Sequence, residues 1–130
     1  MRKLFTLMAC AALTASSAFA DIKIGETTYS TLKDAVADGQ TILISGEATC
    51  SDRAITTKDN ISFTIEGEGT DAVVSCTKRG TQVLLCNQSG ATVNVKNVTF
   101  DGGNRQWDTN PVVAAEKGTM NFENVTFKNF

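Results

Sequence analysis

After residue 40 the apolar residues recur with a period of two, in short runs separated by Gly and Asn. Successive side chains of a strand point to opposite faces, so this alternation predicts β-strands with one buried face. Residues 61–65, Ile-Ser-Phe-Thr-Ile, form the clearest such run. An unbroken apolar run, such as Val-Leu-Leu at 83–85, is typical of a strand buried on both faces. The pattern therefore predicts an all-β region of many short strands.

An internal repeat indicates how these strands are arranged. Residues 92–100, Thr-Val-Asn-Val-Lys-Asn-Val-Thr-Phe, return 27 residues later at 119–127 as Thr-Met-Asn-Phe-Glu-Asn-Val-Thr-Phe. Six of the nine positions are identical, and both exchanged apolar positions remain apolar. Looser copies begin at Thr41 and Ile61. One repeat cannot bury its inward side chains alone, so a period of this size predicts parallel stacking of equivalent strands.

The looser copies give an expected alignment of the repeats. Placing Ile44, Ile65, Val95 and Phe122 above one another gives steps of 21, 30 and 27 residues. Unequal steps are expected if one bend of each repeat carries the loops. The longest predicted loop is 101–111.

Asparagine marks the predicted bends between strands. Asn97 and Asn124 occupy equivalent bends of the two repeat copies, where Asn tolerates the left-handed backbone conformation of a sharp corner. A β-sandwich is the main alternative arrangement of the same strands. It predicts hairpin turns at regular spacing, and the 27-residue echo favours stacking instead.

One helical pattern precedes the strands. The segment 31–38 opens with a Thr-x-x-Asp cap pattern and is followed by Gly39. Leu32, Ala35 and Val36 have the i, i+3, i+4 spacing of one helix face. A helix of about two turns forms through packing rather than alone, so we expect this face to cover an apolar surface.

These segments together resemble the start of the pectate-lyase-like superfamily. The resemblance covers nearly all of 28–130 and rests on four motifs: Thr-Leu-Lys-Asp-Ala-Val, Gly-Gln-Thr-Ile-Leu-Ile-Ser-Gly, Ile-Ser-Phe-Thr-Ile-Glu-Gly, and Asn-Val-Thr-Phe, which occurs twice. It implies an all-β fold, a right-handed parallel β-helix (solenoid), with 31–38 as a short N-terminal capping α-helix. The superfamily contains lyases, hydrolases, esterases, phage tailspikes and surface adhesins, so the resemblance implies no single activity.

The first twenty residues have the pattern of a secretory signal peptide. A basic start, Met1-Arg2-Lys3, is followed by a short apolar stretch and then by small residues up to Ala20. The stretch is too short for a membrane span. Cleavage at Cys10, as in a lipoprotein, would leave too short an apolar segment, so we expect the cut between Ala20 and Asp21.

The predicted organisation follows from that cut. Residues 1–20 form a signal peptide of bacterial type, 21–40 an N-terminal strand with the capping helix, and 41–130 the β-helix coils. The mature chain is then expected to be secreted, periplasmic or at the cell surface, without a membrane span. The last predicted strand is followed by no cap, so we expect this coil to self-associate or to continue in a longer protein, and we favour the second, with 41–130 truncated at its C-terminus.

Charge and cysteine content exclude several classes of function. Without the signal peptide, 14 acidic and 10 basic residues remain, a net charge near −4, and no basic stripe for nucleic acid is present. With no histidine and no Cys-x-x-Cys pair, no metal site or cofactor is predicted. Cys50 and Cys76 each follow a glycine turn, so they are candidates for a disulfide between adjacent coils. The alternative is that they are small core residues.

Candidate chemistry is sparse. No catalytic constellation is present, and Glu66, Glu68 and Asp71 are interpreted as a solvated turn rather than a calcium site. The 101–111 loop is the best candidate for binding, with Arg105, Trp107 and Asp108 as a set that could stack on a sugar ring and bond its hydroxyls. The alternative is that Trp107 covers an apolar edge.

Two functional hypotheses remain. The preferred one is an exported, non-catalytic β-helix scaffold of surface or adhesin type, whose partner is a carbohydrate or a cell-surface component. The alternative is the N-terminal part of a polysaccharide lyase or glycoside hydrolase with its active coils beyond Phe130.

Overall fold

The computed structural model describes residues 21–50, 54–76, 83–104 and 112–130. In these ranges the regular structure consists of β-strands apart from one short helix, which confirms the predicted all-β class. The elements, in chain order, are β1 (Asp21–Ile24), β2 (Thr27–Tyr29), α1 (Leu32–Ala35), β3 (Thr41–Ser45), β4 (Glu47–Cys50), β5 (Ala54–Ile55), β6 (Ser62–Gly67), β7 (Val73–Cys76), β8 (Leu84–Cys86), β9 (Thr92–Lys96), β10 (Thr99–Asp101), β11 (Val113–Ala115), β12 (Thr119–Glu123) and β13 (Thr126–Lys128).

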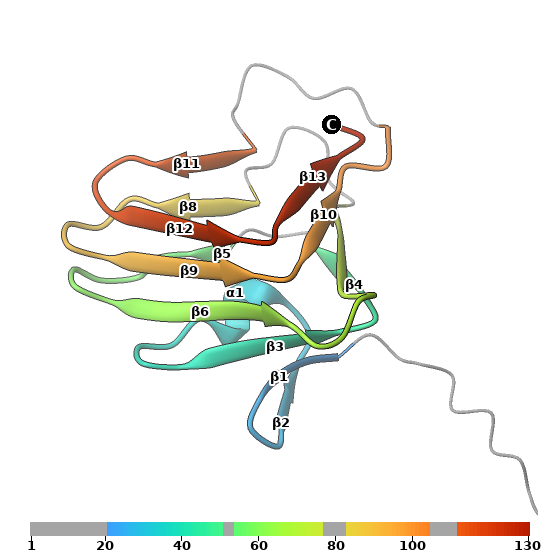
Figure 1. The fold of residues 1–130 in the computed structure, drawn as a ribbon. Coiled ribbons are helices and arrows are strands. Elements are labelled where there is room, and N and C mark those ends of the chain that lie inside the picture. Colours follow the sequence, from blue (N-terminus) through green and yellow to red (C-terminus); the bar gives the residue numbers. More distant parts are fainter. Residues whose placement is uncertain (1–20, 51–53, 77–82, 105–111) are drawn as a thin grey trace, which may run out of the picture.

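The strands form three sheets that the chain visits in turn (Figure 1). The first sheet has the order β12-β9-β6-β3-β1-β2, the second β13-β10-β7-β4 and the third β11-β8-β5. From β3 onward every pairing is parallel. One strand from each sheet makes a layer, so β3 begins the first layer, β6 the second, β9 the third and β12 the fourth.

The 27-residue repeat is confirmed by the strand register. β12 pairs with β9 so that Thr119 lies opposite Thr92 and Phe122 opposite Val95. β13 continues the match on β10, where Phe127 lies opposite Phe100. The two copies of the repeat are therefore stacked directly, one above the other.

One predicted alignment is wrong. Ile44 lies opposite Gly67, and it is Ile42 that lies opposite Ile65. The first step is therefore 23 residues, from 42 to 65, rather than 21. The error arose because Ile42 and Ile44 point to the same side of β3, so the alternation alone could not distinguish their registers.

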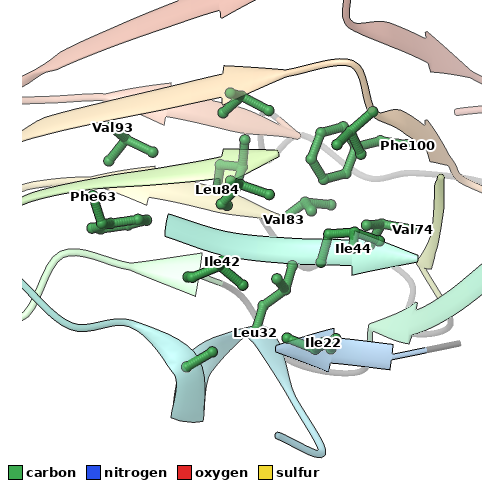
Figure 2. Packing of buried hydrophobic residues seen from close by; sticks show 14 of the residues in the cluster. Ile22, Leu32, Ile42, Ile44, Phe63, Val74, Val83, Leu84, Val93 and Phe100 are labelled. Carbon is green, nitrogen blue, oxygen red and sulfur yellow. The ribbon is translucent and has the colours of Figure 1, made fainter. Parts of the chain in front are cut away.

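The apolar side chains of the three sheets point into one shared core (Figure 2). Burying each large aliphatic or aromatic side chain contributes about 1.5–3 kcal/mol, so this core is the main source of stability. The largest fully buried members are Phe100, Leu32, Ile42, Ile44, Ile61, Ile65, Leu84, Val74, Val83, Val93, Val95 and Val98.

Asparagines turn the chain at the corners between sheets. In the described ranges all five non-glycine residues with positive φ are asparagines, and Asn97 (φ 54°) and Asn124 (φ 57°) are the two predicted from the repeat. Their side chains stack as well, because Asn124 Nδ2 donates to Asn97 Oδ1 at 3.2 Å. The corner thus repeats with the strands, in backbone and in side chain.

The β3 end of the core is covered by the N-terminal segment. β1 pairs antiparallel with β3, with Ile22 opposite Ile44, and β2 extends the sheet as a hairpin. α1 packs against β1, β2 and β5, and Leu32 reaches from it towards Ile42 and Ile22 (Figure 2).

The helix is shorter than predicted. Asp34 N donates to Thr31 Oγ1 at 3.1 Å, which confirms the N-cap, but α1 ends at Ala35 and Val36 is extended. The chain leaves the helix early because residues 38 and 39 bond the start of the next layer. Asp38 Oδ1 accepts from Ser62 N at 2.8 Å, and Gly39 N donates to Ser62 O at 2.6 Å.

Candidate functional site

The predicted carbohydrate-binding set lies outside the described residues. Arg105, Trp107 and Asp108 all fall in the undescribed range 105–111, so this set stays a prediction. The structure does describe the point where that segment begins, at Asp101 and Gly103.

The start of the segment is fixed to the fourth layer by the Asp101 carboxylate. Its Oδ1 accepts from Asn129 Nδ2 at 2.9 Å and from Gly103 N at 2.8 Å, and its Oδ2 lies 3.3 Å from Lys128 Nζ. The Asn129 hydrogen bond, followed by the Gly103 N–H and Lys128, lowers the pKa of Asp101 below its ordinary value. Asp101 therefore orders the loop entrance as an anion.

A groove of about 410 Å³ follows the corner between the first and second sheets. It crosses three layers in the stacking direction, because its walls come from the β6–β7 loop, the β9–β10 corner and the β12–β13 corner. The lining residues are Gly69, Thr70, Ala72, Asn97, Val98, Thr99 and Asn124.

The groove has an apolar floor and a polar, uncharged rim. Ala72 and Val98 are buried, whereas Thr70, Asn97 and Asn124 are exposed. The bond from Asn124 Nδ2 to Asn97 Oδ1 leaves Asn97 Nδ2 as a donor and Asn124 Oδ1 as an acceptor. Alternating amide donors and acceptors beside hydroxyl groups suit a ligand that is itself rich in hydroxyls.

Two features of the backbone hold the groove in shape. Backbone hydrogen bonds join the β9–β10 corner to the layers on either side, since Asn97 N donates to Glu123 O at 3.0 Å and Thr99 N donates to Ala72 O at 3.0 Å. Gly67 permits the close approach beneath it, because a Cβ there would overlap the carbonyl oxygen of Asn97. The rim side chains therefore project from a backbone with little freedom to move.

The backbones of Cys50 and Cys76 lie opposite one another on β4 and β7. This register is the one that the proposed disulfide requires, since paired residues of adjacent strands have Cα atoms within bridging distance. The bridge itself stays a prediction.

Cys86 is a buried core thiol. Its Sγ lies 3.7 Å from Ala91 O and 3.8 Å from Thr119 O, as a weak donor to both carbonyls. Burial raises the pKa of the Cys86 thiol, so the nucleophilic thiolate is disfavoured at neutral pH.

Among the described residues, the acidic turn has no neighbours that would complete a metal site. Glu66 lies opposite Lys96 on β9, Glu68 is exposed, and Asp71 accepts a hydrogen bond from the adjacent Thr70 hydroxyl. Across the described ranges, no three His, Cys, Asp or Glu side chains gather closely enough to hold a metal ion. Those ranges also contain no helix with the length and apolar character to cross a membrane.

The sequence did not predict the corner groove, although the repeat includes several of its lining residues. The repeated Asn-Val-Thr at 97–99 and 124–126 was interpreted as corner geometry alone. What the repeat could not show is that the β6–β7 loop, from Gly69 to Ala72, lies beside the corner and supplies the second wall.

Comparison of the chain with protein-family models, with curated proteins and with solved structures gave no match.

Proposed function

We propose that this chain is an exported, non-catalytic scaffold of surface or adhesin type that binds a neutral carbohydrate in the corner groove. We propose its architecture as a right-handed parallel β-helix of the pectate-lyase-like superfamily, with α1 as the N-terminal cap. Support for the architecture comes from the parallel pairing of successive layers in all three sheets, and from α1 packing at the β3 end.

The observation that carries the binding proposal is the groove rim. Thr70, Thr99 and the Asn97–Asn124 amide pair present hydroxyl and amide groups across three layers, and none of the lining residues is charged. A neutral glycan matches this chemistry, because its hydroxyls both donate and accept hydrogen bonds. The floor beneath the rim at Val98 is buried, so the exposed rim groups would make the contacts with the glycan.

The predicted set on the 101–111 segment would form a second contact. Trp107 would stack on a ring, and Arg105 and Asp108 would bond its hydroxyls. Export is supported by the signal-peptide pattern, and amino-terminal sequencing of the secreted product should begin at Asp21.

Calorimetric titration with neutral oligosaccharides tests the groove. Asn124→Asp keeps the shape of the corner residue but places a negative charge beside Asn97, and Thr99→Val removes a rim hydroxyl. We expect each variant to weaken binding about tenfold, the effect of losing one hydrogen bond to a ligand, about 1.4 kcal/mol. Asn60→Asp is the matched control, since Asn60 also has positive φ (58°) but lies outside both the groove and the 101–111 segment.

Unchanged binding in Asn124→Asp and Thr99→Val, with loss in Trp107→Ala, would assign the ligand to the loop instead. Incubation with acidic polysaccharides, followed by absorbance of unsaturated products, tests the non-catalytic part of the proposal. Turnover would favour the lyase alternative.

A further inference from the structure

The walls of the corner groove are uncharged, but acidic residues lie directly beside them. Glu68 and Asp71 flank the two lining residues at the tip of the β6–β7 loop, and both are exposed. Glu123 precedes Asn124 at the β12–β13 corner and is exposed as well. A ligand in the groove therefore lies near carboxylates that it does not need to touch.

The lysines near this corner already have carboxylate partners. Lys96 Nζ lies 3.5 Å from Glu123 Oε2, and Lys96 also lies opposite Glu66 in the strand register. Lys23 Nζ lies 2.7 Å from Asp21 Oδ2. Neither lysine is therefore a free positive charge for an anionic ligand.

Glu68 and Asp71 have no such partner. Among the described residues, no lysine or arginine forms an ion pair with either carboxylate. Asp71 accepts a hydrogen bond from the neutral Thr70 hydroxyl at 3.1 Å. The pKa of Lys23 is raised first by Asp21, and Glu68 makes only a smaller contribution. The β6–β7 loop therefore gives one wall of the groove two negative charges without a paired cation.

The loop that carries these charges is held at both ends by the layer below it. Glu68 N donates to Ile44 O at 2.8 Å, and Val73 N donates to Gly46 O at 2.9 Å. Only a few residues lie between these two bonds, so the backbone of Asp71 has little room to move away when a ligand enters. The two carboxylates therefore stay beside the groove in the bound state.

We propose that Glu68 and Asp71 make the groove select against anionic glycans, such as polyuronates, by electrostatic repulsion. This inference rests on the proposed function and deepens it, because it assigns the selectivity to two residues that do not line the groove. The lining residues offer hydrogen bonds that any hydroxyl-rich chain can use. The two carboxylates then determine which of those chains bind.

The expected size of the effect follows from Coulomb's law. Each carboxylate belongs to a residue next to the lining, so a charge on the ligand comes within roughly 8 Å of both. In water, two such repulsions correspond to about a fivefold loss of affinity for each ligand charge in the groove. The Debye length falls from about 30 Å at 0.01 M salt to about 3 Å at 1 M. The selectivity should therefore be present at low ionic strength and nearly absent at high ionic strength.

A matched series of ligands separates charge from shape. The β-1,4-linked hexamers of glucose, glucuronate and glucosamine share one backbone, and they are neutral, anionic and cationic when the uronates are ionised and the amines protonated. Calorimetric titration at low ionic strength, with EDTA to remove bridging cations, should give the tightest binding for glucosamine and the weakest for glucuronate. Each charged hexamer differs from the neutral one at a single group per ring, so a steric effect alone would not shift the two in opposite directions. Galactose-based hexamers provide a second backbone.

The double variant Glu68→Gln/Asp71→Asn removes both charges and keeps the side-chain shapes. We expect the affinity for the glucuronate hexamer to rise about fivefold or more, and the affinity for the neutral hexamer to change less than about twofold. Asp59→Asn/Glu116→Gln is the matched control, because these exposed acids lie at the opposite corner of the first sheet, shortly before β6 and β12 begin. The control should leave the ratios between the three hexamers unchanged.

The titrations distinguish two kinds of failure. If the neutral hexamers of both backbones do not bind, the proposed function fails and the charge selection fails with it. If the neutral hexamer binds and the glucuronate hexamer binds equally well at low ionic strength, only the charge selection is overturned. Equal effects of the double variant and its control overturn the assignment to Glu68 and Asp71.

Discussion

The two ends of the stacked layers begin from the same sequence pattern and differ in what covers them. In the first layer Ile42 and Ile44 are fully buried, because β1 pairs along β3 and α1 inserts Leu32 beneath the core. In the fourth layer Phe122 has the same inward orientation and is 45% exposed. A layer of this fold therefore has no core of its own, and the stability of each inward residue depends on the layers next to it.

Phe100 and Phe127 offer the sharpest test of this dependence. They end the same Val-Thr-Phe motif and lie opposite one another in adjacent layers, with stacked rings 5.2 Å apart. Phe100 is fully buried, so we expect Phe100→Ala to lower the free energy of unfolding by about 3–5 kcal/mol through lost burial and a cavity. Phe127 is 40% exposed, so Phe127→Ala should cost less than half as much.

Urea denaturation monitored by circular dichroism gives both values from the same assay. Similar losses for the two variants would contradict the comparison, since they would mean that the fourth layer is as well covered as the third.

The corner asparagines test whether the cost of backbone strain also depends on the neighbouring layers. Asn97 lies between two layers and its N–H donates to Glu123 O, whereas Asn124 belongs to the last layer. Alanine in a left-handed conformation costs about 1–2 kcal/mol, so Asn97→Ala should be destabilising by about that amount. The open corner can relax, so Asn124→Ala should cost less.

Asn97→Gly and Asn124→Gly separate the cost of backbone strain from the cost of losing the side-chain hydrogen bond between Asn124 and Asn97. Glycine adopts positive φ without strain, so it should recover most of the alanine loss. Thermal denaturation of the four variants provides the measurement. A glycine variant as unstable as its alanine counterpart would place the cost in the side-chain bond between the two amides rather than in the backbone.

The parts of the fold that could be predicted are those encoded by periodicity. The repeat of 92–100 at 119–127 predicted the parallel register of β9 and β12. The corner asparagines were predicted because Asn tolerates the left-handed backbone conformation, and their positive φ angles confirm this. Ile44 was misaligned because the alternation in β3 offers two equivalent inward positions. Periodicity identifies the buried face of a strand, but it does not determine the register between two strands that a loop connects.

The parts that could not be predicted depend on contacts between segments of unrelated sequence. Nothing in Asp21–Ile24 specifies that β1 pairs antiparallel with β3, because an edge strand of either direction satisfies the same alternation. The corner groove likewise needs the β6–β7 loop beside Asn97, a juxtaposition between different repeats. The set Arg105, Trp107 and Asp108 was chosen from neighbours in sequence, and it stays a prediction because 105–111 lies outside the described ranges.

The smallest expected effect concerns the bonds that tie β13 to β10 at the open end. Asn129, Gly103 and Lys128 hold the pKa of Asp101 below its ordinary value of 3.8, so the anion is stabilised only in the folded chain. Its contribution to stability is present above that value and is lost as the pH falls through the lower pKa of the folded state. Asp101→Asn should therefore flatten the acid limb of the stability curve below about pH 4. Hydrogen exchange shows where the stability is lost. Amides at 126–129 should lose protection in acid before those of β3, because β3 makes no contact with the Asp101 carboxylate. Simultaneous loss of protection at both ends would show that the layers unfold as a single unit.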